Sequence, residues 1–287
     1  MIIATHNGKF HADDVFGVAL LKQLYPDAQV VRSRDPKVLD QADIVLDVGG
    51  VYDVEARRFD HHQVSSGARD SGILYSAFGL LWQHYGKEFC GNDDVWLKID
   101  SRLVTAIDAV DNGQDLYEVS DFGTRPFDLS EYLGLFNPIG ADEDFDSQFM
   151  VAVSLATSVL LRLRAKYLDV IASEEYFLAQ YAASEDKRIV VLDRYIPHGS
   201  IASKQPELLY TIYPGATGNW TVQTVRPEKS QFGNRKDLPD AWRGLQGKDL
   251  AEVTGVADSV FCHKAAFICA AESKEGALAL ADLALKN

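Results

Sequence analysis

Hydrophobic and polar positions alternate in blocks along the first part of the chain. Short apolar runs that are typical of strands occur at 2–5, 29–32 and 44–48. Between them, apolar residues with helical spacing predict a helix at 15–24 and a shorter one at 37–42, after the turn at Asp35-Pro36. Strands and helices that alternate at this spacing favour a parallel sheet with helices on both faces.

The rest of the chain divides into a helical part and a part rich in short strands. Helical periodicity predicts further helices at 73–85, 96–110 and 149–187. After position 188, strand-like runs separated by Gly, Pro and Asn occur at 189–192, 209–213 and 220–225. A helix is expected at 275–286. We therefore predict an α/β domain at 1–145, a helical connector at 146–187 and a smaller α+β domain at 188–287.

Charge and cysteine content indicate which ligands and which redox compartment the protein suits. The 287 residues are 47% hydrophobic, enough for a full core, and 42 acidic side chains outnumber 28 basic ones, which leaves a net charge of −14. This balance argues against a broad basic patch, although a site that recruits cations could still attract phosphate. The three cysteines, Cys90, Cys262 and Cys269, lack paired zinc spacing and suit a reducing compartment.

The N-terminal residues and the apolar runs carry no sign of export or of a membrane. The chain begins without the charged segment and long apolar segment of a signal peptide, and no apolar run approaches the ~20 residues of a membrane span. We therefore expect a cytoplasmic protein with no membrane partner.

Histidines and aspartates gather just after the first predicted strand. His6 follows that strand, and His11, Asp13 and Asp14 lie where the next helix begins. In an open α/β sheet the ligand site lies outside the carboxyl ends of the strands, which is where these residues belong. Taken singly, each has an ordinary explanation, since a polar residue can end a strand and an aspartate can cap a helix.

Two further groups strengthen the prediction of a site. Asp47 interrupts an apolar strand, where a carboxylate is costly unless it is paired or bound to metal, and Gly49-Gly50 would let the backbone approach a ligand closely. Asp60-His61-His62 could supply an imidazole ligand, a second imidazole near a substrate oxygen, and a carboxylate that fixes the ring tautomer. The Asp-His-His tripeptide alone is a weak signal. It becomes a strong one because it follows the His6 to Asp13 motif and the Asp47-Val48-Gly49-Gly50 strand end.

A helix ending near position 113 supplies another pair of carboxylates. Asp108 and Asp111 lie three residues apart and share one helix face, so one could bind metal while the other orients a ligand. Carboxylates near the C-terminus of a helix are mildly unfavourable, which favours a functional role over a structural one.

These motifs, in this order, resemble the DHH phosphoesterase superfamily. More closely, the chain is similar to the MYG-type family, the melanocyte-proliferating-gene proteins described as exonucleases and formerly as metal-dependent protein hydrolases. The segments that carry this resemblance are Thr5-His6-Asn7-Gly8, Phe10-His11-Ala12-Asp13, Arg34-Asp35-Pro36, the run from Asp47 to Tyr52, Asp60-His61-His62-Gln63, Leu238-Pro239 with Ala241-Trp242-Arg243-Gly244, and Glu275-Gly276-Ala277. The resemblance spans nearly the whole chain.

The resemblance implies a site for two divalent metal ions, usually manganese. Asp47 would bridge the metals and act in catalysis with His62, a phosphate contact, and Asp60. The implied metal ligands are His6, His11, Asp13, Asp47, His61 and Asp111. Asp14 and Asp108 would hold these ligands in place. Two choices stay open: the ligand could be Asp13 or Asp14, and it could be Asp108 or Asp111.

This chain departs from the superfamily in its first motif. It has His6-x4-His11-x-Asp13 where the superfamily has His-x3-Asp-x-Asp. A histidine in place of an aspartate softens the ligand set, so zinc and iron stay open beside manganese, and magnesium is left open as well. The residues imply two-metal hydrolysis of a phosphate ester, in which no protein nucleophile is needed. No Gly-rich P-loop motif is present, which argues against ATP-driven phosphoryl transfer.

The C-terminal domain is expected to hold the rest of the substrate. Its candidate phosphate and base contacts are Arg226, Arg235, Arg243, His263 and Lys264. Trp242 is expected to pack in the core rather than stack on a base. The superfamily usually has a glycine pair near the C-terminus, where this chain reads Phe267-Ile268-Cys269-Ala270-Ala271.

The leading hypothesis is a manganese-dependent exonuclease on single-stranded or short RNA or DNA. The resemblance implies RNA and the 3′ to 5′ direction. A hydrolase of small nucleotides or pyrophosphate, which the acidic charge favours, and a metal-binding scaffold with little turnover are the alternatives. A homo-oligomer is left open, because the long connector helix could pack within one chain or against another.

Overall fold

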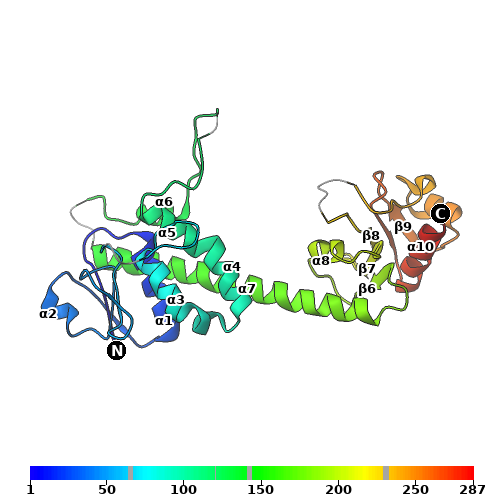
Figure 1. The fold of residues 1–287 in the computed structure, drawn as a ribbon. Helices are drawn as coiled ribbons and strands as arrows, with labels where there is room; N and C mark the ends of the chain where they lie inside the picture. The colour runs from blue at the N-terminus through cyan, green and yellow to red at the C-terminus, as the bar shows by residue number, and fades with distance from the viewer. Residues whose placement is uncertain (64–66, 120, 141–143, 229–232) are drawn as a thin grey trace. The chain divides into compact units, whose positions relative to one another are not determined.

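A computed structural model describes the chain over residues 1–63, 67–119, 121–140, 144–228 and 233–287. It forms two compact units, Met1–Leu168 and Asp169–Asn287, each with its own sheet (Figure 1). The boundary between the units falls inside helix α7 (Phe145–Ala183), which occupies most of the segment where the sequence predicts a connector.

The sheet of the first unit has the order β2-β1-β3-β5-β4. Its strands are β1 (Ile2–Thr5), β2 (Gln29–Arg32), β3 (Ile44–Leu46), β4 (Tyr52–Asp53) and β5 (Arg58–Phe59). Strands β2, β1, β3 and β5 run parallel, and β4 pairs antiparallel with β5 at the edge. The α/β fold expected from the sequence is therefore confirmed, with one antiparallel edge strand added to the parallel sheet.

Helices lie on both faces of this sheet. On one face, α1 (Ala12–Leu24) packs against α3 (Ala77–Cys90), where the Phe16 and Phe78 rings are 5.4 Å apart. On the other face, the short helix α2 (Pro36–Leu39) adds to a second core cluster, made of Ala4, Leu39, Ala42, Val45 and Val48. Neighbouring residues of β1 and β3 point to opposite faces, as a pleated strand requires.

Three consecutive helical segments lead to Asp108 and Asp111, the predicted carboxylates of the site that come latest in the chain. These segments are α4 (Asp93–Ile99), a π-helical turn (Asp100–Val104) and α5 (Thr105–Asp111). The run begins three residues earlier than the periodicity predicts, because the Asn92 side chain caps it by accepting hydrogen bonds from the backbone N–H groups of Asp94 and Val95. Helix α6 (Leu129–Gly134) follows further along.

The sheet of the second unit has the order β6-β7-β8-β10-β9. Its strands are β6 (Ile189–Val191), β7 (Tyr210–Pro214), β8 (Trp220–Thr224), β9 (Ser259–Cys262) and β10 (Ile268–Ala271). Strand β6 is parallel to β7, and the other pairs are antiparallel.

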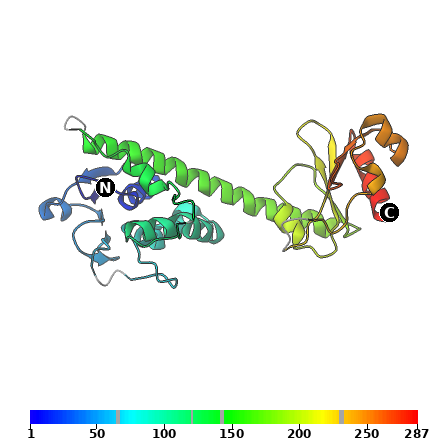
Figure 2. The same ribbon diagram turned by 90° about the horizontal axis from the view of Figure 1, so that it is seen from above.

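Two hydrophobic cores cover the two faces of the second sheet. Helix α10 (Lys274–Lys286) lies along one face (Figure 2), with Tyr210 of β7 fully buried beneath it. Trp242 belongs to this core too, as the sequence indicates. The second core contains Phe177 of α7 and residues of helix α8 (Gly199–Ser203), and helix α9 (Gly247–Thr254) packs beside β9.

Helix α7 is long and apolar. Among the described helices, it is the one whose length and composition would allow it to cross a membrane. Core helices of soluble proteins meet the same test. The side chains on one of its faces are buried in the first unit, among them Phe149, Ala152, Ala156 and Leu160. The sequence-based expectation of no membrane partner stays a prediction.

Gly86 lies in α3 where a larger residue has no room. A Cβ atom there would come within 2.6 Å of the buried Trp82 ring and 2.9 Å of Trp96. We expect Gly86→Ala to reduce the free energy of unfolding by about 1–3 kcal/mol, because overpacking displaces these rings. Gly134→Ala in α6 is the control, since a Cβ there meets nothing within 4 Å. Urea unfolding of both variants tests this, and equal stability would contradict the packing described.

Candidate metal centre

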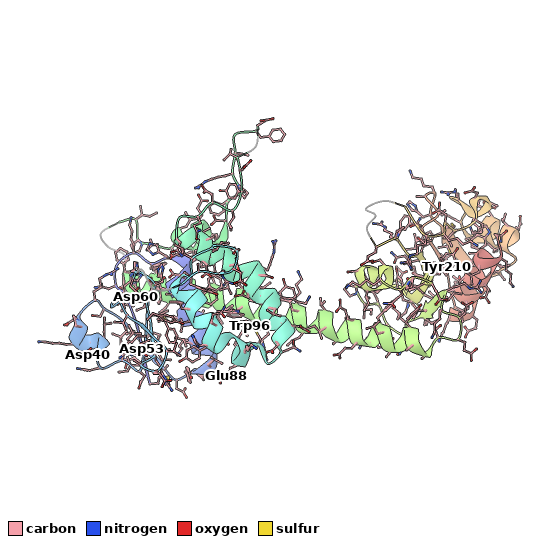
Figure 3. The ribbon with its side chains drawn as sticks, viewed as in Figure 1. Asp40, Asp53, Asp60, Glu88, Trp96 and Tyr210 are labelled. Atoms are coloured by element: carbon pink, nitrogen blue, oxygen red, sulfur yellow. The ribbon has the colours of Figure 1, made fainter. Side chains whose placement is uncertain are left out.

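The carboxyl ends of three neighbouring parallel strands bring the predicted residues together. His6 follows β1, Asp47 follows β3, and the Asp60-His61-His62 segment follows β5. Asp60 is labelled in Figure 3, within the first unit. The N-terminus of α1 adds His11, Asp13 and Asp14, and the last residue of α5 adds Asp111. We use the name acidic cluster for eight residues together: His6, His11, Asp13, Asp14, Asp47, His61, His62 and Asp111.

The backbone at Asp47 ends the strand and turns its side chain into the cluster. Asp47 has φ 54°, a left-handed conformation that non-glycine residues rarely adopt. Strand β3 therefore ends at Leu46, two residues before the end that the apolar pattern predicts. Gly49 and Gly50 follow with φ 99° and 69°, which glycine tolerates. Strain of this kind persists where the surroundings hold it in place, and it is common at functional sites.

Distances within the acidic cluster are short. His6 Nε2 lies 3.1 Å from Asp47 Oδ2 and 3.2 Å from Asp14 Oδ2. His61 Nε2 lies 3.4 Å from Asp47 Oδ1 and 3.2 Å from Asp111 Oδ2. Asp47 is therefore the carboxylate that faces histidines from two different strand ends.

Most of these charged groups are buried. Asp13 and Asp14 are fully buried, and His6 and Asp47 are 2% and 3% exposed. Both carboxylate oxygens of Asp13 and Oδ1 of Asp47 accept no hydrogen bond from the residues that the structure describes. A buried carboxylate without such partners is costly unless it is protonated or binds a cation. The donor set and its unsatisfied oxygens thus fit a bound metal.

The pKa values of the aspartates in the acidic cluster are shifted, because the aspartates are buried close to one another and to histidines. Burial, followed by the charges of Asp47 and Asp111, raises the pKa of Asp13 well above its usual range. Burial likewise raises the pKa of Asp14 to about 7, although His6 opposes the shift. Burial also works against ionisation of Asp47, but the neighbouring imidazoles of His6 and His61 outweigh it and lower the Asp47 pKa to about 2. The cluster therefore holds protons where no cation balances its charge.

The tautomer of His6 also points to a cation. Its Nδ1 lies 3.2 Å from the Asn7 carbonyl oxygen, which can only accept a hydrogen bond, so Nδ1 carries a hydrogen. Neutral His6 then turns the lone pair of Nε2 toward the carboxylates of Asp14 and Asp47. A metal ion between these atoms, or a second proton on the ring, relieves that repulsion.

Three overlapping groups of residues have the spacing of metal ligands. They are His6, His11 and Asp47; Asp47, His61 and His62; and His11, Asp13 and Asp111, with ligand atoms within 4.8 Å of one another in each. Asp47 is shared by the first two groups, as a bridging ligand would be. His11 belongs to the first group with His6 and also to the third group with Asp13 and Asp111.

The structure separates the predicted supporting residues from the ligand groups. Asp14 accepts a hydrogen bond at 2.9 Å from the backbone N–H of His11, so it holds that backbone in place, and its other oxygen lies 3.2 Å from Nε2 of His6. Asp60 accepts hydrogen bonds at 2.6 Å from Gly50 N–H and from Nδ1 of His62. His62 itself is largely exposed, so the other edge of its ring is available to a substrate.

Asp108 is buried outside the ligand groups. Its carboxylate accepts hydrogen bonds from the N–H and hydroxyl groups of Ser76 and from Nε of Arg69, which also binds Asp100 through both Nη atoms. Gly79 leaves room for it, since a Cβ there would lie 2.3 Å from Asp108 Oδ1. Asp108 thus fixes α5, which carries Asp111. Sequence reasoning missed Arg69, because nothing in its local pattern marks it.

Two other residues missed from sequence hold the loop that carries His11. Asn137 accepts a hydrogen bond from the N–H of Phe10 and donates one to its carbonyl, both at 2.9 Å. The buried Arg32 guanidinium donates to the Gly8 carbonyl and lies over the rings of Phe10 and Phe149. These contacts join residues far apart in sequence, so local patterns do not reveal them.

The predicted substrate residues of the second unit have different surroundings. Arg235 donates to the carbonyls of Ser203, Gln205 and Leu208, and Arg243 binds Asp237 and Asp240. Nδ1 of His263 accepts from the Ala265 N–H, and Lys264 is exposed. Arg226 alone of these five lines a cavity in the second unit, of about 470 Å³. Their role toward a substrate stays a prediction.

Comparison with known proteins gives matches along the whole chain. Residues 2–285 match the family model MYG1_exonuc, described as "Uncharacterised protein family (UPF0160)". The chain is 32% identical to the MYG1 protein of Schizosaccharomyces pombe, a match that covers 99% of this chain and 97% of the relative. It is also 32% identical to the human MYG1 exonuclease, over 97% of this chain and 84% of the relative. A MYG1 protein of Chlamydia trachomatis is 30% identical, over 99% and 96% of the two chains.

The ion pair of Arg69 should be important for stability. Arg69→Met would leave Asp108 buried without its cation, and we expect a loss of about 3–5 kcal/mol in the free energy of unfolding. Arg125→Met is the matched control, because Arg125 pairs with Glu131 at an exposed position, where an ion pair contributes little to stability. Urea unfolding measures both, and a small effect at Arg69 would rule out the anchoring role.

Metal should stabilise the protein more at higher pH. The raised pKa of Asp14, about 7, means that protons stabilise the metal-free fold below that pH, and this contribution is lost as the pH rises through 7. Metal binding competes with these protons. We expect manganese to raise the melting temperature more at about pH 8 than at about pH 5.5.

Asp13→Asn is the control for this measurement. It removes one buried charge, so the metal-free variant should be folded and should gain little from manganese at either pH. A wild-type shift that is equal at both pH values, or larger at the lower one, would contradict the link between the cluster and metal.

Proposed function

This chain belongs to the MYG1 family, and from that premise we propose that it hydrolyses phosphodiester bonds as a divalent-metal-dependent exonuclease. Relatives that carry the name MYG1 exonuclease, among them the human protein, support the nuclease role. The metal dependence is our inference from the chemistry of the acidic cluster. We infer single-stranded or short RNA as the substrate and the 3′ to 5′ direction from the family resemblance.

The observation that carries this proposal is the shared position of Asp47. It belongs to one group with His6 and His11 and to another with His61 and His62, and one of its buried oxygens accepts no hydrogen bond from any described residue. This is the arrangement expected for a carboxylate between two cations. Two bound ions would supply a hydrolytic water of lowered pKa and neutralise the charge that develops on the phosphate.

The chain's own residues have separate tasks in this scheme. Asp60, fixed by the Gly50 N–H, holds Nδ1 of His62, so the exposed ring in its imidazolium form can donate a hydrogen bond from Nε2 to a phosphate oxygen. Asp14 keeps the His11 backbone in place. Because these side chains are held before a substrate arrives, little reorganisation is needed during the reaction.

The donor set favours manganese among the common divalent ions. Imidazole nitrogens from His6, His11 and His61 join carboxylates from Asp13, Asp47 and Asp111. Magnesium prefers oxygen ligands and water, whereas manganese, iron and zinc accept imidazole more readily. We therefore propose two manganese ions, with zinc and iron as the alternatives.

Length dependence separates the exonuclease from a hydrolase of small nucleotides. We expect metal-depleted protein with added manganese to shorten a single-stranded RNA of about 20 nucleotides stepwise, at a higher rate per end than it cleaves a dinucleotide. Asp47→Asn should lower this rate at least about 100-fold, because it weakens the ligand common to both metals. Gel analysis of end-labelled RNA measures both.

Asp94→Asn is the matched control for this assay. Asp94 is exposed in the first turn of α4, so the substitution makes the same change in charge outside the cluster and should leave the rate unchanged. An Asp47→Asn variant with most of the wild-type rate would refute the two-metal scheme. Cleavage of the dinucleotide alone would assign the protein to small-nucleotide turnover, and no cleavage with metal bound would favour a scaffold.

A further inference from the structure

A cavity in the second unit has the composition of a small-molecule site. Its volume is about 470 Å³, and its lining includes His198, Ser200, Thr211, Gln223 and Arg226. Its described lining comes from β7 and β8, whose part we call the floor, and from α8 with its neighbouring residues, all within one unit. Pockets for small ligands measure roughly 300–1,000 Å³, and this volume suits one nucleotide rather than several.

The floor of the cavity is polar but uncharged. His198 Nδ1 lies 2.8 Å from the Ile196 carbonyl oxygen, so it must donate, and Nε2 accepts from the Thr211 hydroxyl at 2.9 Å. Burial lowers the pKa of His198, and its ring stacks on Phe177 at an interplanar angle of 8°. Both nitrogens are therefore satisfied with one proton, and the floor suits a neutral base or sugar.

Gln223 presents a hydrogen-bond donor to the cavity. Its Oε1 accepts a hydrogen bond of 2.6 Å from the Tyr213 hydroxyl, and burial raises the pKa of Tyr213 to about 12, so that hydroxyl stays protonated. The oxygen end of the amide is thus occupied. The Nε2 group, which can donate two hydrogen bonds, is the end that can serve a ligand.

An exposed aromatic ring lies beside the cavity. Tyr195 is 62% exposed, and its ring centroid lies 5.4 Å from that of Tyr213 and 6.3 Å from that of His198. A nucleic-acid base can stack on such a ring without regard to its identity, and each such contact contributes to binding of single strands. Tyr195 therefore offers a stacking surface next to the hydrogen-bonding groups.

The charges that line the cavity limit the ligand. Among the described residues of the lining, Arg226 is the cationic one, and Glu228 lies in the lining as well. One guanidinium beside one carboxylate suits a single phosphate better than a polyphosphate, and Glu228 can accept from ribose hydroxyls. Together with the neutral floor, this combination matches a nucleoside monophosphate.

We propose that this cavity, which we call the nucleotide pocket, binds one nucleotide unit of the nucleic-acid substrate. The base and ribose would bind Gln223 and the Thr211 side of the floor, and the phosphate would bind Arg226. The proposal rests on the proposed function in taking that nucleotide to be part of the substrate. The pocket itself needs no metal, so its binding can be measured separately from hydrolysis.

The binding test uses the full chain with a chelator present. Uridine 5′-monophosphate is titrated by calorimetry into wild type, Gln223→Glu and Gln180→Glu. Gln223→Glu keeps an oxygen for the Tyr213 hydroxyl but removes the donor, so its dissociation constant should rise about tenfold. Gln180 of α7 does not line the pocket, and its variant should bind as wild type does.

Two results of this test would overturn the proposal. One is no saturable binding by the wild type, and the other is equal binding by wild type and Gln223→Glu. Uridine without phosphate should bind more weakly than the monophosphate, and Arg226→Gln should remove that difference. Thermal melting of each variant identifies any loss of folding, and the Arg226 comparison of two ligands within one variant does not depend on it.

A second measurement separates the pocket from the catalytic proposal. With manganese and RNA, Gln223→Glu should raise KM and leave kcat unchanged, since the acidic cluster is intact. An unchanged KM would overturn the pocket's role in substrate binding, while RNA hydrolysis by the wild type would still support the proposed function. Binding of the monophosphate without hydrolysis of any RNA would overturn the proposed function and the assignment of this ligand to a substrate.

Discussion

Mutual repulsion among buried carboxylates is the constraint on which the first unit depends. Asp13, Asp14 and Asp47 are at most 3% exposed, and the charge of Asp47 raises the cost of ionising both Asp13 and Asp14. Histidines balance part of this charge, since hydrogen bonds and charges from Asp47 overcome burial and raise the pKa of both His6 and His61. What remains is a demand for protons or cations, so the stability of this unit is linked to whichever of them the cluster binds.

The backbone around the cluster has an unusual conformation, and residues distant in sequence hold it in place. Asp47 takes a left-handed conformation so that its carboxylate can face the ends of β1 and β5. Asn137 and Arg32 fix the loop between His6 and His11 by binding the backbone of Phe10 and Gly8. Without these supports the carboxylates would separate, because their repulsion favours an open loop.

The features that depend on neighbouring residues in the chain could be predicted from the sequence. Apolar runs placed β1 and β2 at their observed positions, and histidines and aspartates at the strand ends marked where a site should form. The strands β4 and β5, with two residues each, are too short for a periodic signal. Arg69 and Asp108 are separated by 39 positions, and Tyr213 and Gln223 by ten across two strands. Such pairs exist only after the chain has folded, so no local pattern could show them.

The acidic balance of the chain bears on how it could hold a nucleic acid. A net charge of −14 repels phosphates at long range, and of the arginines expected to bind them, Arg235 and Arg243 are engaged by backbone carbonyls or aspartates. Under the proposed function, attraction must then come from cations bound in the acidic cluster and from short-range contacts elsewhere. Uncharged hydrogen bonds and stacking lose little to long-range repulsion, and they act on one nucleotide at a time. An acidic nuclease of this kind is therefore expected to depend on a few close contacts near the end of a strand, rather than on a long positively charged groove.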